Sequence, residues 1–303
     1  MKHQDLAALE KEREWFASMP KSGVRRCLVG ISGGKDSSAT LYHLIALGFT
    51  PIAFTLDSGY YPEHIFERSA EVAKNAGVEH IRVDIRDRAR GVDLESFRLT
   101  AELYDRVDDP GAEEAFKIAY REGREHYSIK CDHALAFVRT CQLCRRLVIR
   151  GYSKLANDLG IDHVVLGINE WAGLSASVKN GEEQYASAVR VLRPEGGHPV
   201  NVIHLPFMFS RTVSQTYELL DKHGWVAPRG ERLVEANWNS CMFAGAANHR
   251  AKGLLGFDPD TTRLSREVTC GFLSRGEAAA ALERAQGLRT TVREVLERAG
   301  VLS

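Results

Sequence analysis

The sequence predicts an α/β fold: a twisted parallel sheet with helices on both faces, of Rossmann type, followed by a helical C-terminal part. Apolar runs of strand length alternate with amphipathic stretches of helix length through the first 170 residues. Several of those stretches stop at a glycine, which is a common residue just past the end of a helix. The pattern changes near residue 206, so we expect an α/β domain over 1–205, including an N-terminal helix, and a mainly helical domain over 206–303.

The individual elements follow from the same patterns. Apolar runs predict strands at 24–31, 51–56, 79–84 and 162–167, with weaker ones at 188–192 and 200–205. Helical spacing predicts helices at 4–18, 36–47, 62–76, 141–159, 211–223, 243–253, 274–286 and 289–299. Residues 86–130 are charged and mixed and are expected to be helical with loops whose positions the pattern does not fix, and 172–186 form a polar segment typical of a loop.

Composition excludes several classes of protein. The 303 residues include 40 Lys and Arg and 40 Asp and Glu, so the formal net charge is zero and no global basic field points to nucleic acid. No apolar run approaches the roughly 18 residues that a membrane helix needs. The charged N-terminus lacks the apolar stretch of a signal peptide. We therefore expect a cytoplasmic protein with reduced thiols, and its six cysteines do not suggest a disulfide framework.

The sharpest motif is Ser32-Gly33-Gly34-Lys35-Asp36-Ser37, between the first predicted strand and the first helix of the sheet. Two glycines let the backbone turn tightly beside a ligand. The free N–H groups at the start of the next helix favour an anion, and the hydroxyls of Ser32, Ser37 and Ser38 and the charge of Lys35 add to this. The segment therefore predicts a polyphosphate cradle, although it lacks the spacing of a Walker loop. Asp36 could orient Mg²⁺ or serve only to start the helix.

This motif resembles that of the PP-loop ATP pyrophosphatases, and the resemblance covers about residues 24–170. It implies a five-stranded parallel sheet that binds ATP at the strand ends and cleaves it between the α and β phosphates. Members adenylate a carbonyl oxygen and then displace AMP with nitrogen or sulfur. By the same resemblance, the end of the second strand holds adenine and ribose, and the ligand residues there are Phe54, Thr55 and Asp57.

A later stretch, Gly167-Ile168-Asn169-Glu170, matches a loop that lies over the nucleotide in this family. Some tRNA-modifying members carry a His and paired aspartates there, which this chain lacks. Gly167 is expected at the ATP site. Glu170 could bind Mg²⁺ or be an ordinary solvent-facing residue.

A second motif, Cys141-Gln142-Leu143-Cys144-Arg145-Arg146-Leu147, opens a predicted helix. Arg139, Arg145, Arg146, Arg150 and Lys154 lie around it with no acidic residue among them, and positive charge at a helix start favours thiolate. The same basic run could also be a solvated helix face. A CxxC pair suits an iron–sulfur cluster, structural zinc with Cys131 or His133 as a further ligand, a redox pair, or no metal at all.

The CxxCxRL segment closely resembles that of the tRNA 2-thiocytidine synthetases, a PP-loop branch. This resemblance implies a [4Fe–4S] cluster held by Cys141, Cys144 and Cys241, with one iron left open to carry sulfide. Lys35, Asp36 and these three cysteines are then the catalytic set. A looser resemblance links Gly224-Trp225, the string Asn239-Ser240-Cys241 and Leu273–Ala278 to the PP-loop N-acetyl-sugar amidotransferases.

The expected function is therefore an ATP-dependent sulfurtransferase that uses ATP and Mg²⁺ and releases AMP and pyrophosphate. Its substrate is a nucleobase-like or other small carbonyl compound, or a tRNA base, and its sulfur donor is sulfide or a persulfide protein. The sequence leaves a homodimer open. One rival is an amidotransferase or amide ligase acting on a sugar or similar metabolite, with structural cysteines, and another is a non-enzymatic nucleotide sensor.

Overall fold

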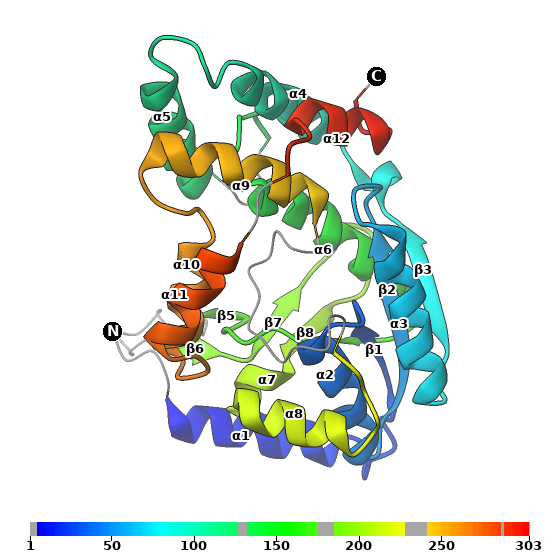
Figure 1. Ribbon diagram of the computed structural model, residues 1–303. Helices are drawn as coiled ribbons and strands as arrows, with labels where there is room; N and C mark the ends of the chain where they lie inside the picture. The colour runs from blue at the N-terminus through cyan, green and yellow to red at the C-terminus, as the bar shows by residue number, and fades with distance from the viewer. Residues whose placement is uncertain (1–4, 127–131, 175–184, 228–240, 286–287, 303) are drawn as a thin grey trace, which may run out of the picture.

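The computed structural model of the chain describes residues 5–126, 132–174, 185–227, 241–285 and 288–302. Its centre is a six-stranded sheet in the order β3-β2-β1-β4-β8-β7 (Figure 1). The strands are β1 (Arg26–Gly30), β2 (Thr50–Asp57), β3 (His80–Asp84), β4 (His163–Leu166), β7 (Val189–Leu192) and β8 (Val200–His204). The first five in this spatial order run parallel, and β7 pairs antiparallel with β8 at the edge.

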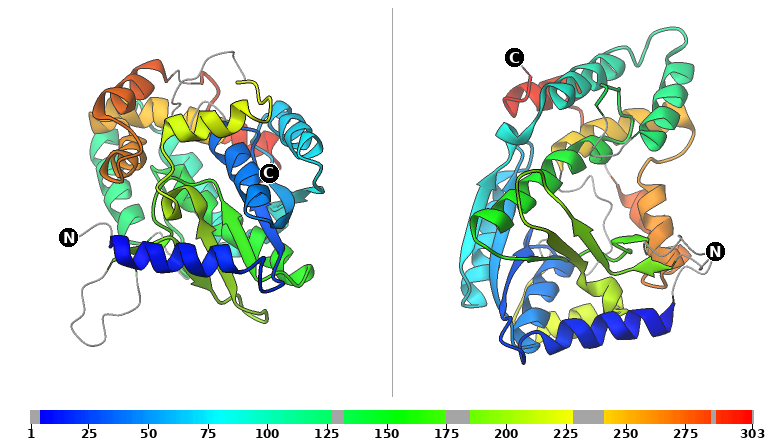
Figure 2. Two further views of the ribbon diagram at one scale, coloured as in Figure 1. Left: turned by 90° about the horizontal axis from the view of Figure 1, so that it is seen from below. Right: turned by 180° about the vertical axis from the view of Figure 1, so that it is seen from behind.

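Helices cover both faces of the sheet, as the fold class predicts (Figures 1 and 2). On one face, α1 (Leu6–Ser18), α2 (Lys35–Ala46) and α3 (Glu63–Asn75) enclose a core that contains Cys27 and Val29 of β1. On the other face, α6 (Thr140–Asp158) packs against Leu28 and Val164. Alternate residues of each parallel strand thus point into different cores, which explains why these strands read as continuous apolar runs.

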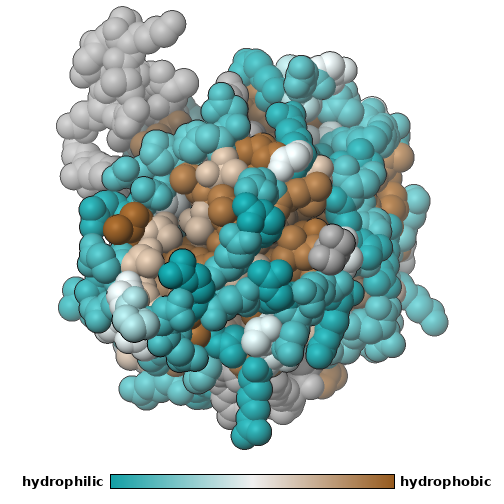
Figure 3. Space-filling model, turned by 90° about the horizontal axis from the view of Figure 1, so that it is seen from above, coloured by the Kyte–Doolittle hydropathy of each residue, from teal (hydrophilic) through white to brown (hydrophobic). Residues whose placement is uncertain are grey.

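A group of helices lies beyond the end of the sheet at which α6 begins (Figure 1). Its members are α4 (Gly91–Asp105), α5 (Ala112–Glu125), α9 (Met242–Leu255) and α12 (Val292–Arg298). They share one hydrophobic core with the first turns of α6, in which Phe97, Phe116, Phe243 and Leu296 are fully buried or nearly so. Seen from this end, apolar side chains gather near the centre of the face and hydrophilic ones surround them (Figure 3).

The remaining elements connect these parts. The short helix α7 (Leu205–Met208) follows β8, and α8 (Val213–Asp221) shares a small core with α2 through Tyr42 and Leu220. A second small core joins α10 (Thr261–Thr269) to α11 (Arg275–Arg284). The chain also forms a 3₁₀ turn, η1 (Arg86–Arg88), and a two-stranded ribbon of β5 (Gly173–Leu174) and β6 (Ala186–Ser187).

The expected α/β class and its main strands and helices are confirmed. Three regions differ in detail from the expectations. The mixed segment 86–130 contains α4 and α5, the loop expected at 172–186 begins and ends in paired strands with 175–184 outside the described residues, and α10 was not predicted. The helical character expected within 86–130 is confirmed, and the structure adds the bounds of α4 and α5.

Within the described residues, no helix combines the length and the apolar character that a membrane crossing requires. The division of the chain at residue 206 stays a prediction. Across that position, α8 packs on α2 while α9 and α12 share a core with α4 and α6.

Candidate functional site

The strand order places a candidate site between β1 and β4. From β1 the chain proceeds to β2 and β3 on one side, and β4 and β8 lie on the other. Such a reversal leaves a crevice outside the carboxyl ends of the two central strands, where parallel α/β proteins bind ligands. The segments that follow β1 and β4 are the two loops that the sequence singled out, 31–34 and 167–171.

The phosphate loop (Ser32–Ser37) closes on itself through its serines. The backbone N–H of Ser32 donates to Ser37 Oγ at 3.1 Å, and Ser37 Oγ donates to Gly34 O at 3.1 Å. The two hydroxyl oxygens of Ser32 and Ser37 are 3.3 Å apart. Helix α2 then begins at Lys35 with no side chain capping it, so its first N–H groups stay available to an anion.

Lys35 and Asp36 form an ion pair at the start of α2, with Nζ and Oδ2 2.5 Å apart. Burial alone would raise the pKa of Asp36, but Lys35, Arg211 and a hydrogen bond with Asn169 hold it below the ordinary value. Asp36 therefore carries its negative charge at neutral pH. A carboxylate of this kind neutralises Lys35 in the absence of ligand and is a suitable oxygen ligand for Mg²⁺.

Gly33 has φ of +69°, a conformation that side-chain-bearing residues rarely adopt. Its carbonyl accepts hydrogen bonds from Arg68 Nε at 2.9 Å and from Trp225 Nε1 at 3.2 Å. The guanidinium of Arg68 also lies over the Trp225 ring. Arg68 of α3 and Trp225, which follows α8, thus hold the outer side of the phosphate loop in place.

Gly167 brings the segment after β4 against the first turn of α2. A Cβ at this position would lie 2.8 Å from the backbone oxygen of Asp36 and from the backbone of Ser37. Only glycine permits this approach without a shift of the backbone. The side chain of Asn169, two residues on, bonds to Asp36. The two predicted loops therefore meet at one carboxylate.

Arg211 is a site residue that sequence reasoning missed. It follows α7, is 6% exposed, and donates from Nη2 to Asp36 O at 3.0 Å and to Thr40 Oγ1 at 3.1 Å. Its Nε and Nη1 have no hydrogen-bond partner among the described residues. Burial lowers the pKa of Arg211 to about 10, so it remains a cation. No motif marks it, because the fold alone brings residue 211 to α2.

The predicted adenine and ribose residues at the end of β2 have well-defined partners. Phe54 is 2% exposed and packs in the α6 core. Thr55 Oγ1 donates to Ile31 O at 2.8 Å, which joins β2 to the segment before the phosphate loop. Asp57 accepts from the backbone of Gly59 and from Arg82 at 2.8 Å. A nucleotide contact by these three residues stays a prediction.

Glu170 lies near the far end of the segment that follows β4 (167–171), which we call the β4 loop. Its Oε2 is 2.7 Å from Arg266 Nη1, in an ion pair between partly buried side chains. Its backbone oxygen is 2.7 Å from Nδ1 of His204, a buried ring whose pKa is lowered to about 4 by loss of water. Glu170 is therefore held toward α10, and a role as Mg²⁺ ligand would require release of Arg266.

The three cysteines of the predicted cluster share one neighbourhood, the cysteine site (Cys141, Cys144 and Cys241). Cys141 and Cys144 lie in the first two turns of α6, and Cys241 is the residue before α9, where its Sγ accepts from Ala244 N. Each of the other two thiols influences the pKa of Cys241. Tyr60, just after β2, donates its hydroxyl to Cys144 Sγ at 2.8 Å.

The thiols of the cysteine site are protonated at neutral pH, so the expectation of thiolates is wrong for the unligated protein. Loss of water around the sulfurs raises the pKa of Cys144 to about 12 and raises that of Cys241 further. The pKa of Cys141 is also raised, chiefly because protein surrounds its thiol although part of the residue is exposed, and then by Asp260. A bound metal would have to displace these protons.

The basic residues after the CxxC pair serve mainly to hold α6 in place. Arg146 is fully buried and pairs with Asp93 at 3.4 Å, and Arg150 also pairs with Asp93. The solvated-face interpretation is therefore wrong for these two arginines, since their cations neutralise a buried carboxylate. The cations that lower the pKa of Cys141 are instead Arg139 and Arg263.

Helix α10 links the two halves of the site. Arg263 pairs with Asp260 at 2.9 Å and with Glu267 at 2.5 Å. Asp260 and Arg263 act on the pKa of Cys141, whereas the pKa of buried Glu267 responds to Arg263, Asp36 and Lys35. Charged residues on one face of α10 thus interact electrostatically with both the phosphate loop and the cysteine site.

Of the two residues expected as further zinc ligands, Cys131 and His133, the structure describes only His133. Among residues 5–126, 132–174, 185–227, 241–285 and 288–302, no three His, Cys, Asp or Glu side chains form a group ready to hold a metal ion. Cys131 lies outside these residues, and His133 is 3.5 Å from Asp132. Cys270 has Glu170, Glu267 and Arg266 as its charged neighbours and is not among the groups that act on the cysteine site.

No family model matches the chain. A curated relative, the uncharacterized protein MJ1599 of Methanocaldococcus jannaschii, is 22% identical over 276 residues, which are 91% of this chain and 78% of the relative. Among solved structures, NMN synthetase from Francisella tularensis aligns with 97% of this chain and 92% of its own, at 12% identity and a TM-score of 0.37. A TM-score of 0.37 is too low to support an argument about fold or function.

Proposed function

We propose that this chain is an ATP-using enzyme of the PP-loop type, and that it is a sulfurtransferase acting on a carbonyl compound. The observation that carries the proposal is the phosphate loop at the β1/β4 crevice, with the cysteine site across α10 from it. The loop offers free helix N–H groups, the Lys35 cation and the Asp36 carboxylate in one place. These are the groups that bind and polarise a polyphosphate.

The proposed reaction has two steps. The substrate carbonyl oxygen attacks the α phosphorus of ATP, and the bond between that phosphorus and the bridging oxygen breaks to release pyrophosphate. Hydrosulfide then adds to the activated carbon, the carbon–oxygen bond breaks, and AMP leaves with the former carbonyl oxygen. The proton of hydrosulfide passes to solvent, and the product is a thiocarbonyl. No electron is gained or lost overall.

In the first step the residues of the phosphate loop act electrostatically. Negative charge moves onto the leaving pyrophosphate, where Lys35 and the α2 N–H groups stabilise it. Arg211 is a buried cation that donates to the backbone oxygen of Asp36 in the first turn of α2 and adds positive potential there. Mg²⁺ fits Asp36, since that carboxylate is ionised, and would supply further charge neutralisation on the phosphates.

The cysteine site would hold the sulfur-carrying group. Its three sulfurs come from two helix starts and interact electrostatically, and three thiolates are the ligand number of a [4Fe–4S] cluster with one open iron. Among the described residues these cysteines do not form a group ready to hold a metal ion, so they would have to come closer together to bind one. Such a cluster, when bound, would present sulfide at its fourth iron. Cys144 and Cys241 would first have to lose their thiol protons, whereas their sulfurs could still accept from Tyr60 and Ala244. The proposed sulfur donor is sulfide itself or a persulfide protein.

The alternative function, an ATP-dependent amide ligase, is favoured by one specific observation. Cys144 and Cys241 already have structural hydrogen bonds, and all three thiols are protonated. In that case the cysteines serve packing, and ammonia instead of sulfide attacks the adenylated carbon. The resemblance of the C-terminal segments to N-acetyl-sugar amidotransferases points the same way.

The test is a joint measurement of metal content and ATP products. Protein purified without oxygen is assayed for iron, acid-labile sulfide and zinc, and then for AMP and pyrophosphate with a set of small carbonyl compounds and bulk tRNA, each with sulfide or ammonia. About four irons with matching sulfide, and sulfide-dependent AMP, support the sulfurtransferase. Ammonia-dependent AMP in iron-free protein would overturn it in favour of the ligase, and ATP binding without AMP would indicate a nucleotide sensor.

A matched pair of cysteine variants sharpens this test. Cys241→Ala is expected to lose the iron and the sulfide-dependent reaction. Cys270→Ala serves as the control, because Cys270 is a partly buried cysteine with different neighbours. Full iron retention in Cys241→Ala would contradict the proposed ligand set.

A further inference from the structure

A hollow in the described part of the molecule lies on the face of α10 opposite Asp260, Arg263 and Glu267. Its volume is about 450 Å³, and Trp171, Phe257, Thr261, Thr262, Ser265, Arg266 and Thr269 line it. A volume of this size is within the usual range for small-molecule sites.

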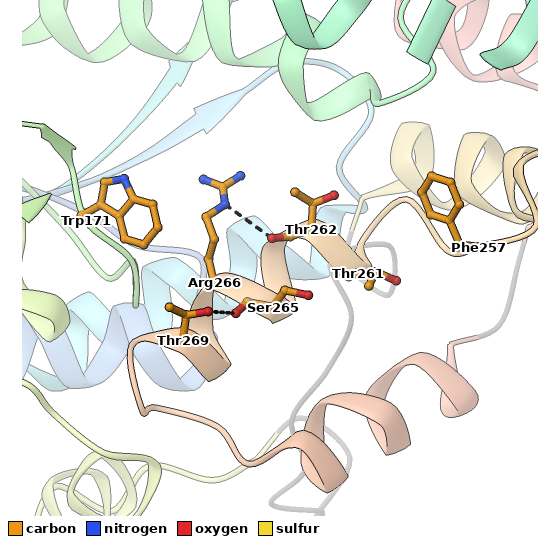
Figure 4. A pocket seen from close by; sticks show the side chains of 7 residues that line it. All are labelled: Trp171, Phe257, Thr261, Thr262, Ser265, Arg266 and Thr269. Carbon is orange, nitrogen blue, oxygen red and sulfur yellow. Dashed lines mark hydrogen bonds between the residues drawn. The ribbon is translucent and has the colours of Figure 1, made fainter. Parts of the chain in front are cut away.

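The lining combines flat rings with hydrogen-bonding groups. Trp171 lies near one end of α10 and Phe257, which is 41% exposed, near the other, and Arg266 extends between them (Figure 4). Four hydroxyl residues, Thr261, Thr262, Ser265 and Thr269, follow one face of the helix. Phe257 is exposed and Trp171 is half-buried, and an aromatic ring at the edge of a pocket can stack against a planar ligand.

The pocket borders on both halves of the candidate site. Trp171 and Glu170 continue the β4 loop whose Asn169 bonds to Asp36, and Glu170 pairs with Arg266 in the lining. On the other side, Tyr120 contacts both the Thr262 hydroxyl at 3.4 Å and the Phe257 ring. Tyr120, Arg266 and Cys141 all act on the pKa of Arg139. The pocket is therefore linked to the phosphate loop side through Glu170 and to the cysteine side through Tyr120 and Arg139.

We propose that this pocket binds the acceptor substrate, and that the acceptor is a free, planar heteroaromatic lactam of nucleobase size. This inference rests on the proposed function, since it names the substrate class of the same site. The ring stacks on Trp171, hydroxyls of α10 hydrogen-bond to its polar edge, and Arg266 exchanges Glu170 for the carbonyl oxygen. An amide N–C=O within a ring is a carbonyl that adenylation can activate.

Charge favours a free compound over a base within tRNA. Binding of a tRNA backbone requires several Lys and Arg side chains that neutralise phosphates. The chain has a net charge of zero, and the only arginine in the lining is paired with Glu170. A neutral ring needs only the stacking surface and a few hydrogen bonds.

The test measures binding without ATP, so that it does not depend on turnover. Uracil, cytosine and hypoxanthine are titrated into the protein and followed by saturation-transfer NMR and calorimetry, with 5,6-dihydrouracil as the matched non-aromatic probe. At least one base is expected to bind, and uracil roughly tenfold more tightly than dihydrouracil, because stacking of one base contributes about 1–3 kcal/mol. No binding by any base, or equal binding of uracil and dihydrouracil, would overturn the proposal.

Variants locate the bound ring. Trp171→Ala is expected to weaken binding roughly tenfold, Trp171→Phe to restore most of it, and Thr262→Val to weaken it a few-fold. Trp15→Ala is the control, because Trp15 is another half-exposed tryptophan in a separate hollow on α1. If Trp171→Ala does not fold, the affinities of Trp171→Phe and Thr262→Val for the base test the proposal instead. Equal affinity in all variants would contradict the pocket.

Two further outcomes separate this inference from the proposed function. Lys35→Ala is expected to bind the base normally while it makes no AMP. Base binding that needs Trp171, in a protein that never makes a thiocarbonyl, would retain the pocket and reject sulfur transfer. Binding of bulk tRNA that depends on Trp171, with no binding of free bases, would overturn the free-compound assignment.

Discussion

The phosphate loop and the cysteine site both lie at helix starts, but they hold charge in opposite ways. At the start of α2, Asp36 is ionised because Lys35, Arg211 and Asn169 outweigh its burial. At the start of α6, burial dominates and keeps the thiols of Cys144 and Cys241 protonated. The same helix dipole is present at both places, so the number of close polar partners decides which form of a buried acid prevails.

This difference suggests a division of labour. The phosphate loop has its charges in place before any ligand arrives and needs little rearrangement to bind ATP. The cysteine site gains charge only when something replaces its protons, as a metal would. Charged residues on one face of α10 interact with both sites, Glu267 with the phosphate loop and Asp260 and Arg263 with Cys141.

The largest effect is expected from a substitution that removes a charge from the phosphate loop. Lys35→Ala should lower AMP formation by roughly 100-fold to 1000-fold, since it removes a cation that stabilises the leaving pyrophosphate. Lys74→Ala, at an exposed position near the end of α3, is the control. AMP is measured by chromatography and folding by circular dichroism. Unchanged AMP in the Lys35 variant would refute the phosphate-loop assignment.

A smaller effect is expected where the β4 loop meets α2. Gly167→Ala places a methyl group 2.8 Å from the backbone of Asp36 and Ser37 and should cost about 1–3 kcal/mol of unfolding free energy. Gly253→Ala is the matched control, because no atom lies within 4 Å of its added Cβ and it lies inside α9. Urea denaturation compares the two. Equal stability would mean that the two loops do not meet as described.

The protonated state of the cysteine site predicts a pH dependence. The raised pKa of Cys144, about 12, means that the folded protein keeps a proton that the unfolded chain loses near pH 8.5. The contribution of this thiol to stability is therefore complete below about pH 8.5 and falls as pH rises, by about 1.4 kcal/mol at pH 9.5. In metal-free protein, the stability of Cys144→Ala should fall less than wild type between pH 7.5 and 9.5. If the free energy of unfolding falls equally in wild type and Cys144→Ala over this range, the Cys144 thiol does not have the raised pKa described here.

The smallest effect concerns the outer side of the phosphate loop. Arg68→Ala removes the hydrogen bond from Arg68 Nε to Gly33 O and should raise the KM for ATP a few-fold with little change in kcat. Steady-state kinetics separates the two constants. Arg98→Ala, in a surface ion pair on α4, is the control. A fall in kcat equal to that of Lys35→Ala would show that Arg68 belongs to the catalytic groups.

The sequence predicted local features well where one segment carries the whole signal. The strand, Gly-Gly turn and helix around the phosphate loop need only neighbouring residues, so the motif could be read directly. By contrast, the Arg run after Cys144 was ambiguous, because its partner Asp93 lies more than fifty residues earlier.

Sequence alone therefore determined the α/β class, the turn that can cradle phosphates and the cysteine motif, since each depends on periodicity or short spacing. Only the tertiary structure decided that Arg211 and Gly167 contact α2, that Cys241 lies near Cys141 and Cys144, and that α10 stands between the two centres. These contacts join residues far apart in the chain. Their physical basis is the packing of helices around a parallel sheet, which no local pattern records.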